Sequence, residues 1–360
     1  MSKASEMPRR ARSQTRRTRN RQPHWAALSD DELLAMPLKN LKLRFTGSWL
    51  DECLHDLNDE LRGRDIKVRA HGWISEDWFS APETAGIAFP FYLAHPRLVR
   101  LERKMMLEAE GGARRECMRI LRHEAGHVVQ YAYGLHRRRR WQNLFGRASA
   151  PYPQHYQPNP ASKNYVQYLR RWYAQCHPDE DFAETFAVWL TPRSNWAARY
   201  ADWPGALTKL EYVDELMAEI AGEKPLPQKR ISVDPLNKLS ITLSEHYQHK
   251  RERYAIDAPT VFDRDLRRVF TSVEDHRGAP LATTVIRRNR GRIVRAVARE
   301  SGEYPFALDA ALDDMMARTR ALNLRAPGPT QKVRRDITAM LTSKAVHSHY
   351  LSSRRAWFAV

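Results

Sequence analysis

Apolar residues between positions 114 and 133 recur at intervals of four, four, three and four residues. They are Cys117, Leu121, Ala125, Val128 and Ala132. This is the spacing of one face of an α-helix, and it predicts a helix from about Arg114 to Tyr133 that Gly134 ends. Gly126 inside this helix costs ~1 kcal/mol relative to alanine. We therefore expect another segment to pack closely against Gly126.

The same kind of pattern predicts elements on both sides of this helix. Upstream we expect a capped helix start at Ser29, a helix near 48–61, strands near 66–70 and 87–92, and a helix from Pro96. Downstream we expect helices near 163–175, 178–190, 205–221, 241–254, 307–322 and 331–341. The predicted fold class is α+β.

A charge and composition change divides the chain into three predicted parts. Residues 1–24 hold eight basic residues against one acidic residue and almost nothing apolar, which predicts a disordered basic tail. Pro225 and Pro227 mark a boundary after a catalytic region at 25–225. Residues 226–360 then form a basic and mostly helical C-terminal extension.

The polar face of the helix at 114–133 carries two histidines one turn apart. His123 and His127 are four residues apart and project away from the apolar stripe. Two imidazoles so placed can hold one metal ion, while Glu124 beside them acts as a general base. The string His-Glu-Ala-Gly-His therefore predicts a zinc hydrolase site.

The string Glu-Asp-Phe-Ala-Glu at 180–184 predicts the third metal ligand. Pro178 suits the first turn of a helix, and Glu180 and Glu184 then lie one turn apart on one face, where like charges repel. A dication would turn this repulsion into attraction. We therefore assign Glu180 as the third zinc ligand and Glu184 as the carboxylate that accepts the free ring N–H of His123.

Other polar residues near this string compete for a role. His177 is an alternative ligand, but it precedes Pro178 and lies outside the predicted helix, so Glu180 is favoured. Asp179 and Asp181 suit the positive end of the helix dipole, and we interpret them as a solvated acidic helix start outside the site.

The two strings together resemble the gluzincin metallopeptidases, whose metal site combines His-Glu-x-x-His with a downstream glutamate helix. Glu-Asp-Phe-Ala-Glu is similar to the corresponding helix of lethal-factor-type proteases. Over roughly residues 70–200 the chain also resembles a bacterial family described as zinc-binding metallopeptidases. The resemblance implies a zincin-like catalytic domain, one zinc ion per chain and a peptide or protein substrate, without identifying that substrate.

The resemblance also implies a hydrogen-bond donor for the oxyanion that develops during peptide hydrolysis. Tyr173, seven residues before Glu180, has a placement similar to the catalytic tyrosine of the lethal-factor type. The alternative is that Tyr173 extends an aromatic stripe in the helix predicted at 163–175 and belongs to the core. Both roles remain open from the sequence.

The strand at 87–92 is a second place where two interpretations stand. Pro90 cannot donate to a ladder, so we expect this strand at a sheet edge. Zincin-type peptidases bind an extended peptide along such an edge. An edge strand that binds nothing is equally compatible with the sequence.

Composition predicts a cytoplasmic protein. The three cysteines have no paired or metal-type spacing, which indicates a reducing compartment. No apolar run approaches the ~20 residues that span a bilayer, so we expect no membrane role.

The net charge of +18 lies entirely outside the region from 25 to 228, which has 27 basic and 27 acidic residues. The tail and the arginine-rich stretch at 286–299 predict at most weak, non-specific nucleic-acid binding. The different-class alternative to a peptidase is a nucleic-acid-associated protein whose zinc site is structural or inactive.

Overall fold

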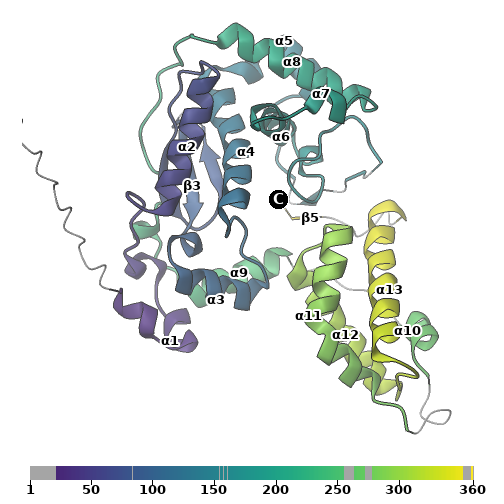
Figure 1. Cartoon of the computed structure of the whole chain (residues 1–360). Helices are drawn as coiled ribbons and strands as arrows, with labels where there is room; N and C mark the ends of the chain where they lie inside the picture. The colour runs from purple at the N-terminus through teal and green to yellow at the C-terminus, as the bar shows by residue number, and fades with distance from the viewer. Residues whose placement is uncertain are drawn as a thin grey trace, which may run out of the picture.

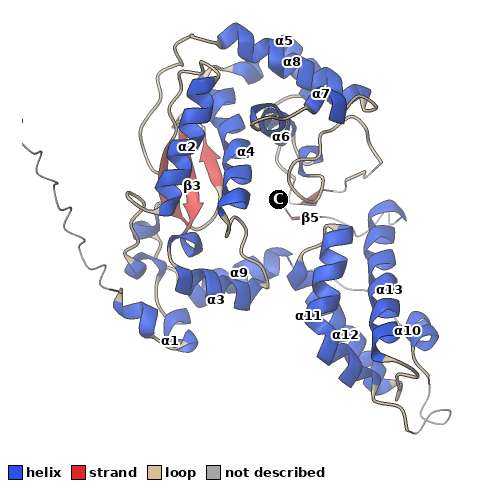
Figure 2. Cartoon of the chain, viewed as in Figure 1, coloured by secondary structure: helices blue, strands red, loops and turns tan. Residues whose placement is uncertain are grey.

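The computed structural model describes residues 22–359, apart from 83, 154, 157, 160, 255–262, 272–277 and 352–357. Most of the predicted basic tail, residues 1–21, lies outside the described residues. The helices gather in two groups (Figure 1), and a small sheet lies in the first group beside α2 and α4 (Figure 2). The predicted α+β class is confirmed.

The first group holds α1 (Asp30–Leu34), α2 (Trp49–Gly63), α3 (Pro96–Met106), α4 (Arg114–Ala132), α5 (Arg139–Phe145), α6 (Pro178–Leu190), α7 (Trp196–Arg199), α8 (Pro204–Ile220) and α9 (Leu243–Tyr254). The second group holds α10 (Asp263–Val269), α11 (Ala282–Ser301), α12 (Pro305–Ala321) and α13 (Thr330–Leu351). The strands are β1 (His71–Ser75), β2 (Phe79–Ala81), β3 (Gly86–Pro90), β4 (His155–Tyr156) and β5 (Phe358–Ala359). No helix in these described stretches is long and apolar enough to cross a membrane.

Local sequence signals locate several helix ends. Ser29 and Glu32 form the predicted capping box at α1, and Ser48 caps α2 through the backbone N–H of Asp51. Pro178 occupies the first turn of α6, where its missing N–H costs nothing. These ends lie within two residues of the predicted ones because each depends on contacts within a single turn.

The predicted edge position of the strand near 87–92 is wrong. The sheet order is β1-β3-β2, with β3 parallel to β1 and antiparallel to β2, so β3 is the central strand. Pro90 is tolerated there because it is the last residue of β3, where the ladder ends. The edge beside α4 is β2.

The strand predicted near 66–70 begins later, at His71. The reason is the side chain of Asn58 in α2, which accepts from the N–H of Ala70 at 2.8 Å and donates to its carbonyl at 3.0 Å. The Asn58 side chain therefore binds the N–H and carbonyl groups of Ala70, which a neighbouring strand would otherwise bind.

Helices α4 and α6 approach closely at Gly126, as the sequence predicts. A Cβ atom at Gly126 would lie 2.7 Å from the Cα of Ala183 in α6. Since the neighbouring atoms belong to the backbone, they cannot move aside as a flexible side chain would. This contact sets the spacing between the two helices that carry the candidate site.

The helix predicted at 163–175 is wrong. The segment is mostly irregular and has only a short 3-10 turn at Tyr173–Gln175. Its backbone N–H groups at Tyr168 and Leu169 instead donate to Glu184 of α6, at 3.3 and 2.8 Å. The aromatic periodicity that suggested a helix therefore belongs to a loop held by a buried carboxylate.

The hydrophobic cores divide later than the predicted boundary at 225. The first core includes Leu236, Leu243 and Tyr247, and the second begins at Leu266. Residues 226–254 thus pack with the first helical group, where α9 contacts α1 and α3. Helix α11 was not predicted, because its many arginines obscure the spacing of the apolar residues that pack on α12 and α13.

Substitution of Gly126 should test the α4–α6 contact. Gly126→Ala should destabilise the protein by about 1–3 kcal/mol, because the added methyl meets backbone atoms in a packed core. The measurement is the free energy of unfolding in urea.

Gly63→Ala is the matched control. A Cβ at Gly63, the last residue of α2, would have nothing within 4 Å, and its φ is not positive. We expect this variant to be neutral or more stable by up to ~1 kcal/mol. Equal stability losses in the two variants would contradict the close contact at Gly126.

Candidate metal centre

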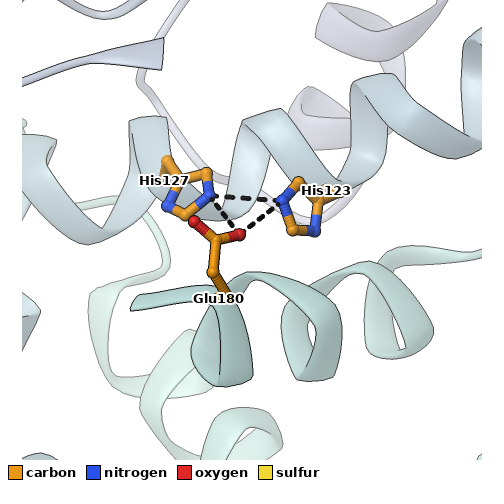
Figure 3. Close-up of side chains that lie close together, drawn as sticks. All are labelled: His123, His127 and Glu180. Carbon is orange, nitrogen blue, oxygen red and sulfur yellow. Dashed lines mark hydrogen bonds and ion pairs between the residues drawn. The ribbon is translucent and has the colours of Figure 1, made fainter. Parts of the chain in front are cut away.

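Three side chains from α4 and α6 point toward one another (Figure 3). The Glu180 Oε2 atom lies 3.0 Å from His123 Nε2 and 3.3 Å from His127 Nε2, and the two imidazole nitrogens are 3.3 Å apart. All three residues are buried, with at most 7% of their surface exposed. The helical spacing of His123 and His127 and the close contact at Gly126 together produce this arrangement.

The three atoms fit a single metal ion. Ligand atoms about 2.0–2.1 Å from a tetrahedral zinc ion lie ~3.3 Å from each other, which matches the spacing of these three atoms. The donor set of two imidazoles and one carboxylate is also one that zinc accepts. His123, His127 and Glu180 could therefore hold a metal ion.

The carboxylate of Glu184 contacts the other ring nitrogen of His123. Its Oε1 atom lies 3.0 Å from His123 Nδ1, and its second oxygen accepts the loop N–H groups of Tyr168 and Leu169. Burial alone would lower the pKa of His123, but Glu180 and Glu184 raise it well above its ordinary value. Glu184 therefore fixes the orientation of the ring and leaves Nε2 directed at Glu180.

Glu124 lies beside the histidines and faces the neighbouring sheet edge. Its Oε2 atom accepts a hydrogen bond of 2.8 Å from the Ser80 hydroxyl in β2. Burial raises the pKa of Glu124, and the nearby His123 and His127 oppose this shift only in part. Ser80 was not predicted, because its contact with Glu124 depends on how β2 packs against α4.

Tyr173 lies against the site without a hydrogen bond to it in the described contacts. Its ring centroid is 5.7 Å from that of His123, and burial raises the pKa of its hydroxyl well above the ordinary value. Tyr173 also packs near Tyr156, at 6.2 Å between centroids. The geometry is compatible with both roles that the sequence left open.

Tyr152 is a site residue that sequence analysis missed. Its hydroxyl donates to Glu180 Oε1 at 3.0 Å, which is the carboxylate oxygen turned away from the histidines. Its ring stacks on His177 at 3.7 Å between centroids. Tyr152 lies in a loop without periodicity, so no pattern pointed to it.

His177 does not join the metal group. Its Nδ1 accepts the N–H of Asp179 at 3.1 Å and caps α6, while its Nε2 lies 2.9 Å from the carbonyl of Ala150. With both ring nitrogens occupied, His177 serves the helix end and supports Tyr152.

The interpretation of Asp179 and Asp181 as a solvated helix start is wrong, because both are 1% exposed. Asp179 accepts from Gln130 and Tyr131, at 2.6 and 2.9 Å, and Asp181 pairs with Lys209 at 2.5 Å. Their position in the first turn matched the helix dipole, but their partners come from other elements.

A cavity of about 460 Å³ opens onto the three candidate ligands and Glu124. Phe79 and Ser80 of β2 line one part of it, and Tyr304 and Phe306 from the start of α12 line another. The second helical group thus contributes to the wall of the candidate site.

Comparison with known proteins finds one family. Residues 99–201, which contain α4 and α6, match the model of a family described as "Putative zinc-binding metallo-peptidase". No curated protein and no solved structure matches the chain. The family match and the His123, His127 and Glu180 group together support a metallopeptidase whose substrates are peptides or proteins.

Proposed function

We propose that this chain is a zinc-dependent peptidase of the gluzincin type. The observation that carries the proposal is the convergence of His123, His127 and Glu180 on one point, with Glu124 beside them in the same cavity. Glu184 holds His123 in its orientation. The similarity of the Glu180–Glu184 string to lethal-factor-type proteases supports the same assignment.

The number of ligands favours an enzyme over a structural zinc site. The metal group found among the described residues has three members, and these face a cavity. Structural zinc sites are closed by four protein ligands, whereas catalytic sites keep one position for water. This difference is the reason to prefer a peptidase over a nucleic-acid-associated protein with a structural zinc.

Zinc in this site would lower the pKa of a water toward ~7 and polarise the peptide carbonyl. Glu124 accepts the proton of the attacking water and then delivers it to the leaving amine nitrogen. The Ser80 hydroxyl holds one oxygen of Glu124 and so directs the other. Tyr173, beside His123, donates a hydrogen bond to the developing oxyanion.

The edge strand β2 suits an extended substrate. It is the outer strand beside α4, and its residues Phe79 and Ser80 line the cavity. A peptide that adds to this edge would pass the candidate metal ligands with its backbone aligned by main-chain hydrogen bonds.

Zinc content tests the ligand set. The purified protein should carry about one zinc ion per chain, and His123→Ala, His127→Ala and Glu180→Gln should each lose most of it, since two ligands hold a dication poorly. Glu184→Gln should weaken the affinity only ~10- to 100-fold. The measurement is metal analysis combined with competition by a chelator.

His55→Ala is the control, because His55 is an exposed residue of α2 away from the metal group. It should keep full zinc content. Full zinc in Glu180→Gln together with loss in Glu184→Gln would show that the third ligand is assigned to the wrong glutamate.

Substitution of the proposed base separates catalysis from metal binding. Glu124→Gln should keep its zinc and its fold but lose at least ~10²- to 10⁴-fold in peptide hydrolysis, because an amide cannot accept the proton of water. Turnover of a peptide library by the zinc-loaded proteins provides the measurement. Hydrolysis at the rate of the unsubstituted protein would remove Glu124 from the mechanism.

The two tyrosines near the site should respond differently. Tyr173→Phe should lower kcat by ~10²-fold with little change in KM if its hydroxyl stabilises the oxyanion. Tyr152→Phe should instead weaken zinc affinity, because its hydroxyl binds Glu180. Unchanged turnover in Tyr173→Phe would return Tyr173 to a role in aromatic packing.

A further inference from the structure

The cavity beside the metal group is lined by charged side chains that pair with one another. Glu102 binds Lys250 at 2.9 Å, Glu108 binds Arg170 and Arg171 at 3.3 and 3.2 Å, and Asp77 lies 3.8 Å from Arg253. Glu124 and Glu180 have the partners described above. In these pairs four cations face three carboxylates, because Glu108 is shared by two arginines.

Glu110 is the exception. Within the described part of the chain, its carboxylate has no ion pair or hydrogen bond, although it lines the same cavity. Arg171, the cation that lowers the pKa of Glu110 most, already binds Glu108 and lies 3.3 Å above the ring of Tyr304. The chain thus places on the cavity wall one carboxylate without an ion pair of its own.

The backbone around Glu110 is held in place. The turn follows α3 through Leu107, at φ 65°, and continues through Gly111, at φ 74°. The Tyr92 hydroxyl donates to the carbonyl of Glu110 at 3.2 Å, and a Cβ at Gly111 would lie 3.0 Å from the ring of Trp78. Because only glycine accepts both this φ and this contact, the turn keeps Glu110 facing the cavity.

The surroundings of Glu110 disfavour the ionised form of its carboxyl group. The residue is exposed and lines the cavity, and the protein atoms around its carboxyl displace part of its hydration. Burial raises the pKa of the carboxyl, Glu108 and Asp77 raise it further, and Arg171 and Lys250 oppose the shift. A cation brought by a ligand would stabilise the ionised carboxylate of Glu110.

The wall next to Glu110 is apolar. Trp78 and Ile120 line the cavity, and both lie within 3.4 Å of the Cβ position at Gly111, the residue next to Glu110. A side chain with an aliphatic stem and a cationic tip matches this combination, since the stem packs on apolar surface while the tip reaches the carboxylate. Lysine and arginine have this shape.

We propose that Glu110 forms a subsite for a lysine or arginine side chain of the peptide substrate. This inference rests on the proposed peptidase function and names the residue class that the enzyme selects. Glu110 acts in specificity and takes no part in the bond-breaking step. A free amino terminus has the same charge but no aliphatic stem, and the experiment distinguishes the two.

The test uses a set of N-acetylated peptides in which one lysine moves along a neutral sequence, with norleucine in its place as the reference. At one position the zinc-loaded protein should prefer lysine by ~10- to 100-fold in kcat/KM, as expected for a hydrogen bond to a charged group. In Glu110→Gln this ratio should fall to about one. In Glu110→Lys the preference should change to glutamate at the same position.

Glu116→Gln is the matched control, because Glu116 is an exposed glutamate at the start of α4 that does not line the cavity. It should keep the lysine preference. A ratio that persists in Glu110→Gln, or a preference that requires a free amino terminus, would overturn the proposal.

A failure of the Glu110 subsite can be distinguished from a failure of the proposed peptidase function. If no peptide is hydrolysed, binding of the lysine and norleucine peptides to the protein can be compared by fluorescence anisotropy. A lysine preference in binding that Glu110→Gln removes would support the subsite even without catalysis. Equal binding of both peptides by the unsubstituted protein would reject it.

Discussion

The buried carboxylates of α6 are the constraint on which the rest of the site depends. Asp179, Glu180, Asp181 and Glu184 are all buried in one short helix. A buried carboxylate without a partner costs several kcal/mol, so each must meet a donor from another element. Gln130 and Tyr131 of α4 bind Asp179, and Lys209 of α8 binds Asp181.

Because these donors come from both α4 and α8, α6 has little freedom to rotate or slide. Rotation about its axis would break several of these contacts at once, and loss of a buried ion pair such as Asp181–Lys209 costs about 3–5 kcal/mol. The position that satisfies Asp179 and Asp181 is also the one that brings Glu180 to the two histidines. The arrangement of His123, His127 and Glu180 is thus set by ion pairs and hydrogen bonds of residues outside this group.

The second helical group extends this constraint to the far wall of the cavity. Arg171 stacks on Tyr304, next to α12, and Arg171 and Trp172 both have left-handed backbones, at φ 64° and 53°. Such conformations cost non-glycine residues about 1–3 kcal/mol each and persist only where neighbours hold them. They directly precede Tyr173, so the C-terminal helices help to place this ring against His123.

The sequence predicts the parts of the site that depend on spacing within one helix. The pairing of His123 with His127, and the contact of Glu184 with His123, follow from residues four apart on facing helices. The helix predicted at 163–175 fails because Glu184 takes up the backbone N–H groups of that segment. Tyr152 was missed because a loop has no period from which a contact can be inferred.

Glu180 and Glu124 line the same cavity but accept from different numbers of donors. This difference supports the separate roles proposed for them. Glu180 contacts two imidazoles through one oxygen and the Tyr152 hydroxyl through the other, so both of its oxygens are committed. A carboxylate held through both oxygens suits the proposed role of a metal ligand.

Glu124 is held through one oxygen by a single neutral hydroxyl, that of Ser80. Its second oxygen keeps lone pairs that can take a proton from water and release it again, which a base must do in each cycle. The proposed ligand and the proposed base therefore differ through the donors that α4, β2 and one loop bring to each carboxylate. This difference lies in the surroundings of the two residues, because both are glutamates.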